Sequence, residues 1–479
     1  MLSTIRFGTD GWRAIIGEDF TFTNVRLLTQ ALVKYLSKEQ LISNVVVGYD
    51  TRFLSFEFAK TVAVIIAQNN IPVTMTSSFV PTPALSYCIT ELGADAGVMV
   101  TSSHNPFNWN GIKIKTSEGI SFPDSETAII ESYIDDSRIF DTNERELFEK
   151  NLSEGLIRWY DPQPSYIKNL ENFVNIESIK HSNLRILIDP MHGSAQGWML
   201  KILEKSTIVP TEIHGDINPS FPSLHAPEPI TQNLTDSFKL MRNNEYDVCL
   251  STDGDGDRFG IIDDKGNFIN QLEAFALLVY YYFEIKELQG PLIRSVTMSR
   301  MIDKLGEKYN SPVFETPVGF KHLSQKMLET KALLAGEESG GAAFIGHIPE
   351  RDGILAGLII LDLITSTGEK ISDLLSELYK IVGPHSYHRL DIPFDNTRRD
   401  EILDRLENMQ PNDIAGFKIL KKDNPDGYRF TLTDDWWLLI RISGTEPLIR
   451  IYAEMPNSNL VKKALDEGQK LLFNNNFQD

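Results

Sequence analysis

The sequence predicts an α/β protein of roughly three or four domains that ends in a separate, smaller α+β unit. Its 479 residues are more than a single hydrophobic core usually organises. Short runs of β-branched residues alternate with longer stretches of helical period along most of the chain, and this alternation favours helices layered on sheets. After Gly383-Pro384-His385 the pattern changes, and we expect strands at 429–432 and 436–440 followed by a helix over 459–472.

Four apolar runs of strand type each end in polar or glycine-rich residues. They are 45–47 before Gly48-Tyr49-Asp50, 97–100 before Thr101-Ser102-Ser103, 185–188 before Asp189-Pro190, and 247–250 before Ser251-Thr252-Asp253. Open α/β sheets bind their ligands beyond the carboxyl ends of the strands. We therefore expect either several sites or one site that is assembled from several domains.

Composition also indicates where the domains meet. Residues 131–164 are largely polar and acidic and end in the proline-rich Asp161-Pro162-Gln163-Pro164, which is typical of a linker. Further boundaries are expected near 264–270 and at Gly383-Pro384-His385. No sequence period marks the resulting parts as repeats. The predicted domains are 1–155, 156–266, 267–385 and 386–479.

The charge balance excludes several kinds of partner. Lys and Arg number 46 against 66 Asp and Glu, so the net charge is 46 − 66 = −20. A surface this acidic repels the phosphate backbone of nucleic acids, and we expect no nucleic-acid partner. It repels phosphorylated small molecules as well. A phosphate site must therefore be built locally, from a few cations, backbone N–H groups or a metal.

Three further features predict a soluble, cytoplasmic protein without a membrane partner. The two cysteines, Cys88 and Cys249, lie far apart and form no CxxC pair, which favours a reducing compartment. The most apolar stretch, 274–283, is about half the ~20 residues that a membrane helix needs. The first residues also lack the apolar core of a signal peptide.

The first motif with chemical content is Thr101-Ser102-Ser103-His104-Asn105-Pro106. A serine in a rigid, exposed turn after a buried strand suits a residue that repeatedly accepts and donates a phosphoryl group. Such a serine needs a proton acceptor, and His104 and Lys113 are the candidates. Taken alone, the motif fits an ordinary polar turn better.

The second motif is Asp253-Gly254-Asp255-Gly256-Asp257-Arg258. Three carboxylates at alternate positions turn their oxygens onto one hard cation, and Mg²⁺ or Ca²⁺ is the chemical match. An EF-hand loop is excluded, because its sixth and twelfth positions would be Arg258 and Asp264 instead of Gly and Glu. A solvated acidic turn is the alternative, but three carboxylates this close repel one another without a cation.

The third motif is Gly336-Glu337-Glu338-Ser339-Gly340-Gly341. Its Glu and Ser side chains, carried on a flexible glycine scaffold, offer hydrogen-bond acceptors and a donor to sugar hydroxyls. Taken alone, the motif fits a plain acidic loop better.

The fourth motif is Arg441-Ile442-Ser443-Gly444-Thr445-Glu446-Pro447, with Arg450 three residues on. Backbone N–H groups and hydroxyls after a strand surround a phosphate, and Arg supplies paired donors. A P-loop is excluded, because no Gly-Lys-[Ser/Thr] follows. A simple turn after a strand is the alternative.

The four motifs together fit one task. A metal site, a nucleophilic serine, a reader of hydroxyls and a phosphate holder are the parts that phosphoryl transfer on a phosphosugar requires.

In these motifs the sequence resembles the α-D-phosphohexomutases, the family of phosphoglucomutases and phosphomannomutases. The four motifs occur in the family's order, and the resemblance spans nearly the whole chain. Within the family, the sequence looks most like a bacterial-type phosphoglucomutase. The opening Arg6-Phe7-Gly8-Thr9-Asp10-Gly11-Trp12-Arg13 also looks like the family's N-terminal segment, which contributes to the active site.

The resemblance implies the fold and the roles of residues. It implies three related α/β domains with mixed sheets and a smaller C-terminal domain around a central cleft. Ser103 would be the phosphoserine, and one of its phosphate oxygens would complete the Mg²⁺ site of Asp253, Asp255 and Asp257. Glu337 and Ser339 would bind sugar hydroxyls. The remaining phosphate would be held by Arg441, Ser443, Gly444, Thr445 and Arg450. Positive charge or proton transfer near the serine would come from Arg13, Lys113, Arg258 and Lys321, with His104 beside it.

The implied mechanism is an exchange through a bisphosphate. Phospho-Ser103 donates to a hexose 1-phosphate, the hexose 1,6-bisphosphate turns over without leaving, and its other phosphate returns to the serine. Hexose 1,6-bisphosphate, here glucose 1,6-bisphosphate, would also be the activator that recharges the enzyme. The expected partner is therefore a phosphosugar, and the sequence leaves monomer and homodimer open.

Substrate choice rests on two short segments. Thr316-Pro317-Val318-Gly319-Phe320-Lys321 resembles glucose-preferring members, and the glucosamine-specific branch typically has Gln where Glu338 stands. Glucose 1-phosphate is the first expectation, mannose 1-phosphate or dual specificity the second, and glucosamine 1-phosphate the third. A relative that binds phosphosugars without catalysis is the other class of hypothesis, but it should have lost Ser103 or one of the aspartates.

Overall fold

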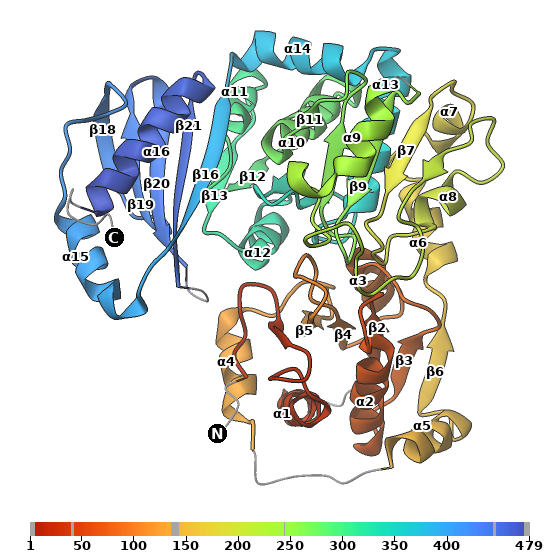
Figure 1. Cartoon of the computed structure of the whole chain (residues 1–479). Helices are drawn as coiled ribbons and strands as arrows, with labels where there is room; N and C mark the ends of the chain where they lie inside the picture. The colour runs from red at the N-terminus through yellow and green to blue at the C-terminus, as the bar shows by residue number, and fades with distance from the viewer. Residues whose placement is uncertain (1–4, 40–42, 136–142, 244, 444–446, 474–479) are drawn as a thin grey trace.

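The chain folds into three α/β domains with mixed sheets and a smaller C-terminal domain, each built on its own sheet (Figure 1). The computed structural model describes residues 5–39, 43–135, 143–243, 245–443 and 447–473. In Figure 1 the first domain lies below, the second and third lie together above it, and the C-terminal domain stands to one side.

The first sheet has six strands in the order β1-β5-β4-β2-β3-β6. Strands β4, β2, β3 and β6 run parallel, and β5 and β1 continue the sheet antiparallel. The bounds are β1 Trp12–Ile15, β2 Val45–Tyr49, β3 Val73–Thr76, β4 Ala96–Val100, β5 Trp109–Thr116 and β6 Ile157–Tyr160. Its helices are α1 Phe22–Glu39, α2 Ser55–Gln68, α3 Thr82–Glu91, α4 Asp124–Ser132 and α5 Glu144–Ser153.

The second sheet has the order β11-β10-β9-β7-β8, with β9, β7 and β8 parallel and β10 and β11 antiparallel. The strands are β7 Ile186–Asp189, β8 Thr211–Glu212, β9 Val248–Thr252, β10 Phe259–Ile262 and β11 Phe268–Ile269. Its helices are α6 Gln163–Leu170, α7 Ile176–Lys180, α8 Trp198–Ile202 and α9 Thr235–Arg242, and a 3₁₀ turn η1 spans Thr231–Asn233.

The third sheet has the order β13-β12-β14-β15, with only β15 antiparallel to its neighbour. The strands are β12 Leu292–Ser295, β13 Val313–Thr316, β14 Leu334–Gly336 and β15 Ala342–Phe344. The helices are α10 Gln271–Tyr280, the π-helical η2 Tyr281–Ile285, α11 Met301–Lys308, α12 Phe320–Thr330, α13 Gly353–Thr367 and α14 Ile371–Val382.

Helix α13 joins the second and third domains into one core. Its sequence is apolar on every side, and all its residues from Gly353 to Ile364 are buried. It packs on β9 and β10 of the second sheet as well as on α10. The Asp352 side chain accepts a hydrogen bond from the Leu355 N–H and thereby caps the helix where it begins. A helix that is hydrophobic all round belongs inside a core, and this one fixes two domains relative to each other.

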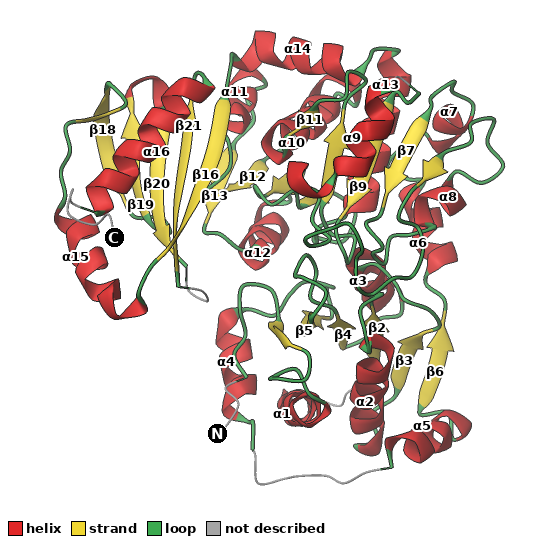
Figure 2. Ribbon diagram, in the orientation of Figure 1, coloured by secondary structure: helices red, strands yellow, loops and turns green. Residues whose placement is uncertain are grey.

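The C-terminal domain is an antiparallel sheet of order β16-β21-β20-β19-β18-β17 with its own core. The strands are β16 Ser386–Pro393, β17 Asp413–Ile414, β18 Phe417–Asp423, β19 Tyr428–Leu432, β20 Trp437–Ile442 and β21 Leu448–Met455. Helices α15 Arg399–Asn408 and α16 Ser458–Leu472 pack with it (Figure 2), and short 3₁₀ turns η3 and η4 span Asn396–Arg398 and Thr433–Asp435. The strands and the helix expected after Gly383 are confirmed.

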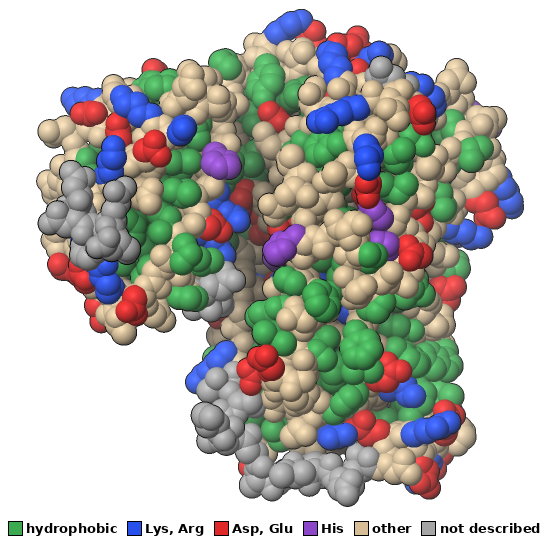
Figure 3. Space-filling model, viewed as in Figure 1, with side chains coloured by type: hydrophobic (Ala, Val, Ile, Leu, Met, Phe, Trp, Pro, Cys, Tyr) green, Lys and Arg blue, Asp and Glu red, His purple; other side chains and the backbone are tan. Residues whose placement is uncertain are grey.

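A hollow lined by charged side chains separates the C-terminal domain from the rest of the molecule in the view of Figure 3. Among the described residues no helix is long and apolar enough to cross a membrane. Cys88 and Cys249 are free and buried. The first sheet extends to β6, just beyond residue 155, and the three predicted domain boundaries remain predictions.

Candidate active site

Three of the four motifs occupy the same place in three different sheets. In each of the first three domains, a parallel strand is followed directly by an antiparallel neighbour, as β4 by β5, β9 by β10, and β14 by β15. The connecting loops carry Ser103, the three aspartates, and Glu337 with Ser339. Of the fourth motif, Arg441 and Ile442 end β20 and Ser443 follows them, in an antiparallel sheet. The first three domains therefore repeat the same strand topology, although no sequence period marks the repeat.

Ser103 is buried directly beside the acidic loop. Its Oγ donates a hydrogen bond to Asp253 Oδ2 at 2.8 Å. Its backbone adopts a left-handed conformation with φ 51°, which is uncommon for a residue other than glycine, and its N–H donates to Thr101 Oγ1 at 2.9 Å. A Cβ on Gly254 would lie 2.4 Å from the Ser103 carbonyl oxygen, so the close approach of the two loops requires glycine there.

Arg52 holds the serine loop from its inner side. Its Nη2 donates to the carbonyl oxygens of Ser103 (2.5 Å) and Asn105 (2.6 Å), and its Nη1 donates to those of Pro106 (2.9 Å) and Trp109 (3.2 Å). Sequence reasoning missed this residue, although it follows the polar end of the first strand run. Asp50, at that same strand end, accepts a hydrogen bond from Thr101 Oγ1 at 2.6 Å. Two strand ends thus fix the geometry of one loop.

The three aspartates of the second motif form a buried carboxylate cluster. Asp253, Asp255 and Asp257 are fully buried, and one ligand atom from each lies within 4.8 Å of the others. Burial and the two neighbouring carboxylates raise the pKa of Asp253 well above its usual range. Among the described residues, Asp255 Oδ1 and Asp257 Oδ1 have no hydrogen-bond partner although both are buried. Oxygen ligands that are clustered, buried and unsatisfied fit a hard divalent cation such as Mg²⁺.

Lys113 supplies positive charge to the same cluster. Its Nζ lies 2.7 Å from Asp10 Oδ2, 2.7 Å from Asp255 Oδ2 and 2.8 Å from Asp257 Oδ2. Burial alone would lower the pKa of Lys113, but the three carboxylates outweigh it and raise the pKa above its usual range. The structure therefore stabilises the ammonium form of this lysine.

His104 is the imidazole next to the serine. Its Nδ1 lies 3.4 Å from Ser103 Oγ. Burial and the surrounding cations, first of all Arg258 and Arg13, hold the pKa of His104 well below its usual range. This environment therefore favours the neutral form of the ring and disfavours the imidazolium.

Arg13 and Arg258 also lie beside the serine loop and the aspartates. Arg13 Nη1 donates to Asn105 Oδ1 at 2.9 Å, in the serine loop. Arg258 Nη1 donates to Glu228 Oε1 at 3.0 Å. Glu228 carries no sequence motif that would have marked it.

The loop at 336–341 is attached to the loop of the three aspartates through the backbone. Arg258 and Gly341 form an antiparallel bridge, and the Phe259 N–H donates to the Gly340 carbonyl oxygen at 3.1 Å. Ser339 Oγ donates to Glu337 Oε1 at 2.6 Å. Glu337 and Ser339 therefore lie beside the aspartates. Arg351, another residue that sequence reasoning missed, pairs with Glu337 and Asp257.

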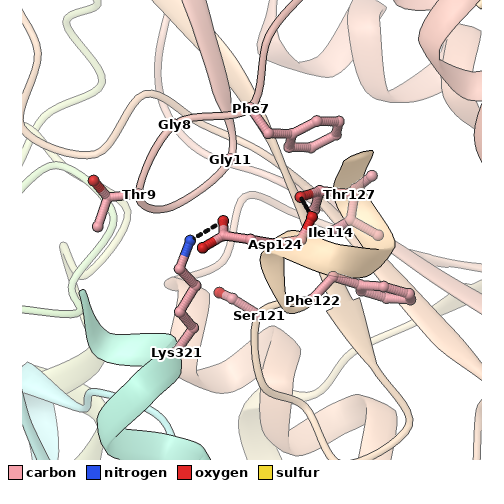
Figure 4. Close-up of a pocket in the computed structure, with 10 residues that line it drawn as sticks. All are labelled: Phe7, Gly8, Thr9, Gly11, Ile114, Ser121, Phe122, Asp124, Thr127 and Lys321. Atoms are coloured by element: carbon pink, nitrogen blue, oxygen red, sulfur yellow. Dashed lines mark hydrogen bonds and ion pairs between the residues drawn. The ribbon is translucent and has the colours of Figure 1, made fainter. Parts of the chain in front are cut away.

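Lys321 lies in a small pocket between the first and third domains (Figure 4). Its Nζ forms an ion pair with Asp124, the first residue of α4. The resemblance places Lys321 near the serine, but its charged partner among the described residues is Asp124 and not a residue of the serine loop. The walls of the pocket are formed by Phe7, Gly8, Thr9, Gly11, Ile114, Ser121, Phe122 and Thr127.

The C-terminal hairpin carries two arginines side by side. Arg441 and Arg450 are opposite each other in the β20–β21 ladder. Like charges in directly opposite positions destabilise a sheet unless an anion offsets them. Arg441 Nε donates to Asp426 Oδ2 at 3.1 Å, and Arg450 Nε lies 3.7 Å from Asp391 Oδ2.

The loop beyond these arginines is only partly described. Ser443 is buried, and its N–H donates to the Leu448 carbonyl oxygen at 2.8 Å. Gly444 and Thr445 lie outside the described residues, so their predicted role in holding a phosphate rests on the sequence.

Comparison with known proteins gives one consistent result. Four family models match in order along the chain: phosphoglucomutase/phosphomannomutase alpha/beta/alpha domain I at 4–139, domain II at 164–266, domain III at 272–382, and the C-terminal domain at 403–468.

Individual relatives cover almost the whole chain. A probable phosphoglucosamine mutase of Methanothermobacter thermautotrophicus is 31% identical over 450 residues, which are 94% of this chain and 93% of the relative. A phosphoglucomutase/phosphomannomutase of Thermococcus kodakarensis is 28% identical over 97% of this chain and 98% of its own. The crystal structure of a putative phosphomannomutase from Thermus thermophilus superposes with a TM-score of 0.86 at 29% identity, covering 98% of this chain and 99% of that one.

Proposed function

The chain belongs to the phosphoglucomutase/phosphomannomutase family, and we propose that it moves a phosphoryl group between O1 and O6 of a hexose through Ser103. One observation carries this proposal. The Ser103 hydroxyl lies 2.8 Å from Asp253 within a buried cluster of three aspartates, between Lys113, His104, Arg13 and Arg258. A phosphoryl group on that oxygen would meet both a metal site and several cations.

The three aspartates and a phosphoserine oxygen would hold the metal. When bound there, Mg²⁺ supplies positive charge against the charge of the transferring phosphoryl group. The chain's own cations do the same from the other sides, because Arg13 and Lys113 reach the serine loop and the acidic loop. Arg52 keeps the serine in place through four carbonyl oxygens.

Each half of the reaction exchanges one P–O bond for another. The 6-hydroxyl of a hexose 1-phosphate attacks phospho-Ser103, the bond from phosphorus to Oγ breaks, and a bond to O6 forms. The proton that leaves the sugar hydroxyl is taken by His104, whose Nδ1 contacts Oγ, and is returned to Oγ. The bisphosphate then turns over, and O1 gives its phosphoryl group back to the serine.

Two sites must accept the sugar in both orientations. Glu337 and Ser339 bind hydroxyls, and Arg441 and Arg450 bind the phosphate that does not react. Arg441 and Arg450 lie in the C-terminal domain and Ser103 in the first, and we infer that the C-terminal domain closes toward the serine when the sugar binds. Lid and domain closure of this kind also excludes water from a phosphorylated residue.

Glucose 1-phosphate is the proposed preferred substrate. Glu338 supports this choice: its carboxylate accepts a hydrogen bond from Thr297 Oγ1 at 2.5 Å, and the glucosamine-specific branch typically has Gln at this position. Mannose 1-phosphate and glucosamine 1-phosphate remain alternatives, because relatives of similar identity carry all three names. A cytoplasmic location belongs to the same proposal.

Initial mutase rates test the proposal directly. Glucose 1-phosphate, mannose 1-phosphate and glucosamine 1-phosphate are compared with Mg²⁺ and a trace of the matching bisphosphate, for wild type and Ser103→Ala. We expect a rate that depends on Ser103 and is highest with glucose 1-phosphate. A Ser103-dependent rate that is equal or higher with another sugar corrects the substrate. If phosphorylated, Mg²⁺-loaded protein turns over none of the three sugar phosphates, this result favours the alternative of a relative that binds phosphosugars without catalysis.

A further inference from the structure

Arg351 is a buried guanidinium that meets carboxylates from three separate parts of the chain. Its side chain is 4% exposed. Nη2 pairs with Asp10 in the N-terminal segment and lies 2.7 Å from Asp257 Oδ2 in the loop of the three aspartates. Nη1 donates to Glu337 Oε1 in the loop at 336–341 at 3.0 Å. One side chain therefore joins the two loops that would handle the phosphoryl group and the sugar.

Arg351 and Lys113 share the same two carboxylate oxygens. Asp10 Oδ2 and Asp257 Oδ2 each accept from Lys113 Nζ, at 2.7 and 2.8 Å, and each pairs with Arg351 Nη2. Two cations and two oxygens thus alternate in a closed ring. Lys113, Arg351 and Asp257 are buried, and the Asp10 side chain is 10% exposed, so a shift of any one of them would leave a poorly solvated charge unpaired.

One carboxylate oxygen of Glu337 accepts hydrogen bonds from within the protein. Among the described residues, Arg351 Nη1 and Ser339 Oγ both donate to Oε1. The planar fork of arginine holds Glu337 through Nη1 while Nη2 is fixed by Asp10 and Asp257, and this leaves Oε2 of Glu337 for a sugar hydroxyl. The chain also makes room for this arrangement, because a Cβ on Gly341 would lie 2.2 Å from Arg351 Cδ.

Building on the proposed function, we propose that Arg351 is the positioning residue that holds the Glu337 carboxylate in a fixed position relative to Lys113 and Asp257. This fixed position matters because the sugar must bind twice, first with O6 and then with O1 beside Ser103. A Glu337 carboxylate that is free to rotate would still admit the first orientation. It would hold the bisphosphate less firmly while it turns over, and the intermediate would escape.

Release of the bisphosphate is the measurement that separates this role from a general loss of stability. Enzyme carrying radiolabelled phosphate on Ser103 is mixed with excess glucose 1-phosphate, and the label is divided between glucose 6-phosphate and free bisphosphate. For Arg351→Lys, which keeps the charge but loses the fork, we expect the ratio of free bisphosphate to product to rise about tenfold. Arg351→Gln should raise it further.

Arg294→Lys is the matched control. Arg294 is also a buried arginine held by two carboxylates, Asp303 and Glu315, but it lies on β12 away from the serine. The ratio of free bisphosphate to product for Arg294→Lys should equal that of wild type. If the Arg351 variants do not fold, Gly341→Ala tests the same point, because the added methyl group displaces the Arg351 stem without removing charge.

A double-mutant cycle identifies the partner through which Arg351 acts. In a Glu337→Gln background, Arg351→Lys should add almost nothing to the ratio of free bisphosphate to product, since both substitutions disrupt the same Arg351–Glu337 interaction. A folded Arg351→Lys enzyme that releases no more bisphosphate than wild type, or fully additive effects, overturns the proposal. If wild type itself transfers no label from Ser103, the proposed function fails, and the role of Arg351 fails with it.

Discussion

Arg52 Nη2 donates a hydrogen bond to the carbonyl oxygen of Ser103 at 2.5 Å, which ties the end of one strand to the loop that follows another. Arg52→Met should leave the serine loop free to shift, and a displacement of about 1 Å at a reacting group costs roughly a hundredfold in rate. We expect kcat of the mutase reaction to fall by that order while the KM for hexose phosphate changes little. Kinetics at saturating bisphosphate measures both, and a kcat near wild type would contradict the prediction. Arg294→Lys again serves as control.

Mg²⁺ should stabilise the folded chain through the three aspartates. A ligand that binds only the native state at about 100 times its Kd adds about 2.7 kcal/mol to the free energy of unfolding. Thermal unfolding with and without Mg²⁺ should show this as a higher Tm for wild type and no shift for Asp255→Asn. Asp263→Asn is the control, because Asp263 is a buried aspartate of the same domain whose carboxylate binds the turn at Lys265 and Asn267. An equal Mg²⁺ shift in Asp255→Asn would exclude this site.

The Asp124–Lys321 ion pair should compete with substrate. Asp124 is exposed and Lys321 is buried, and the pair bridges the first and third domains. Exposed ion pairs are worth at most about 1 kcal/mol, so Asp124→Asn should lower the KM for hexose phosphate by up to about fivefold if Lys321 meets a phosphate. Glu126→Gln, in the same first turn of α4, should have no such effect. A higher KM for Asp124→Asn would show that Asp124 itself helps to bind the sugar.

Acid should loosen the contact between the third and C-terminal domains. Burial alone would raise the pKa of the Glu315 carboxyl, but the guanidinium groups of Arg294 and Arg429 hold it below its ordinary value of 4.5. A carboxyl with a lowered native pKa stabilises the fold fully above its unfolded pKa and loses this contribution as pH falls through the native value.

Arg429→Met removes this contact together with the pair that Arg429 forms with Asp423, another carboxyl whose pKa Arg429 helps to lower. Arg429 Nη1 donates to Glu315 Oε2 at 2.6 Å, and its loss should cost about 1.5–3 kcal/mol near neutral pH. Urea unfolding at a series of pH values should show the difference from wild type shrinking below about pH 4.5. Arg185→Met, which removes an exposed pair with Asp247, should cost at most about 1 kcal/mol. A difference for Arg429→Met that grows toward acid pH would reverse the sign and contradict the assignment.

The local parts of the candidate site are readable from the sequence. The motif at Ser103 and the alternating aspartates each contain their own chemistry within a few residues. Their meeting, with Ser103 Oγ at 2.8 Å from Asp253, follows from strand ends that the apolar runs already indicate. The strands and the helix of the C-terminal domain are also local patterns, with alternating and 3.6-residue periods.

The supporting residues are not readable in this way. Arg52 acts on carbonyl oxygens as far away as Trp109, and Arg351 acts on Asp10, more than three hundred residues earlier in the chain. Each looks like an ordinary polar residue in its own segment, because the partner that gives it meaning is supplied by the tertiary fold. The same holds for Lys321, whose partner Asp124 no local pattern identifies. Packing between domains therefore decides which charges meet.

The central claim is that Ser103 carries the transferred phosphoryl group. The most direct test is the intact mass of the protein after incubation with Mg²⁺ and glucose 1,6-bisphosphate, followed by addition of a hexose monophosphate. We expect wild type to gain one phosphoryl group, located at Ser103 by peptide mapping, and to exchange it with the added sugar, whereas Ser103→Ala gains none. Phosphorylation of Ser103→Ala to the same extent, or a phosphate on Ser103 that no hexose phosphate removes or exchanges, would contradict the account.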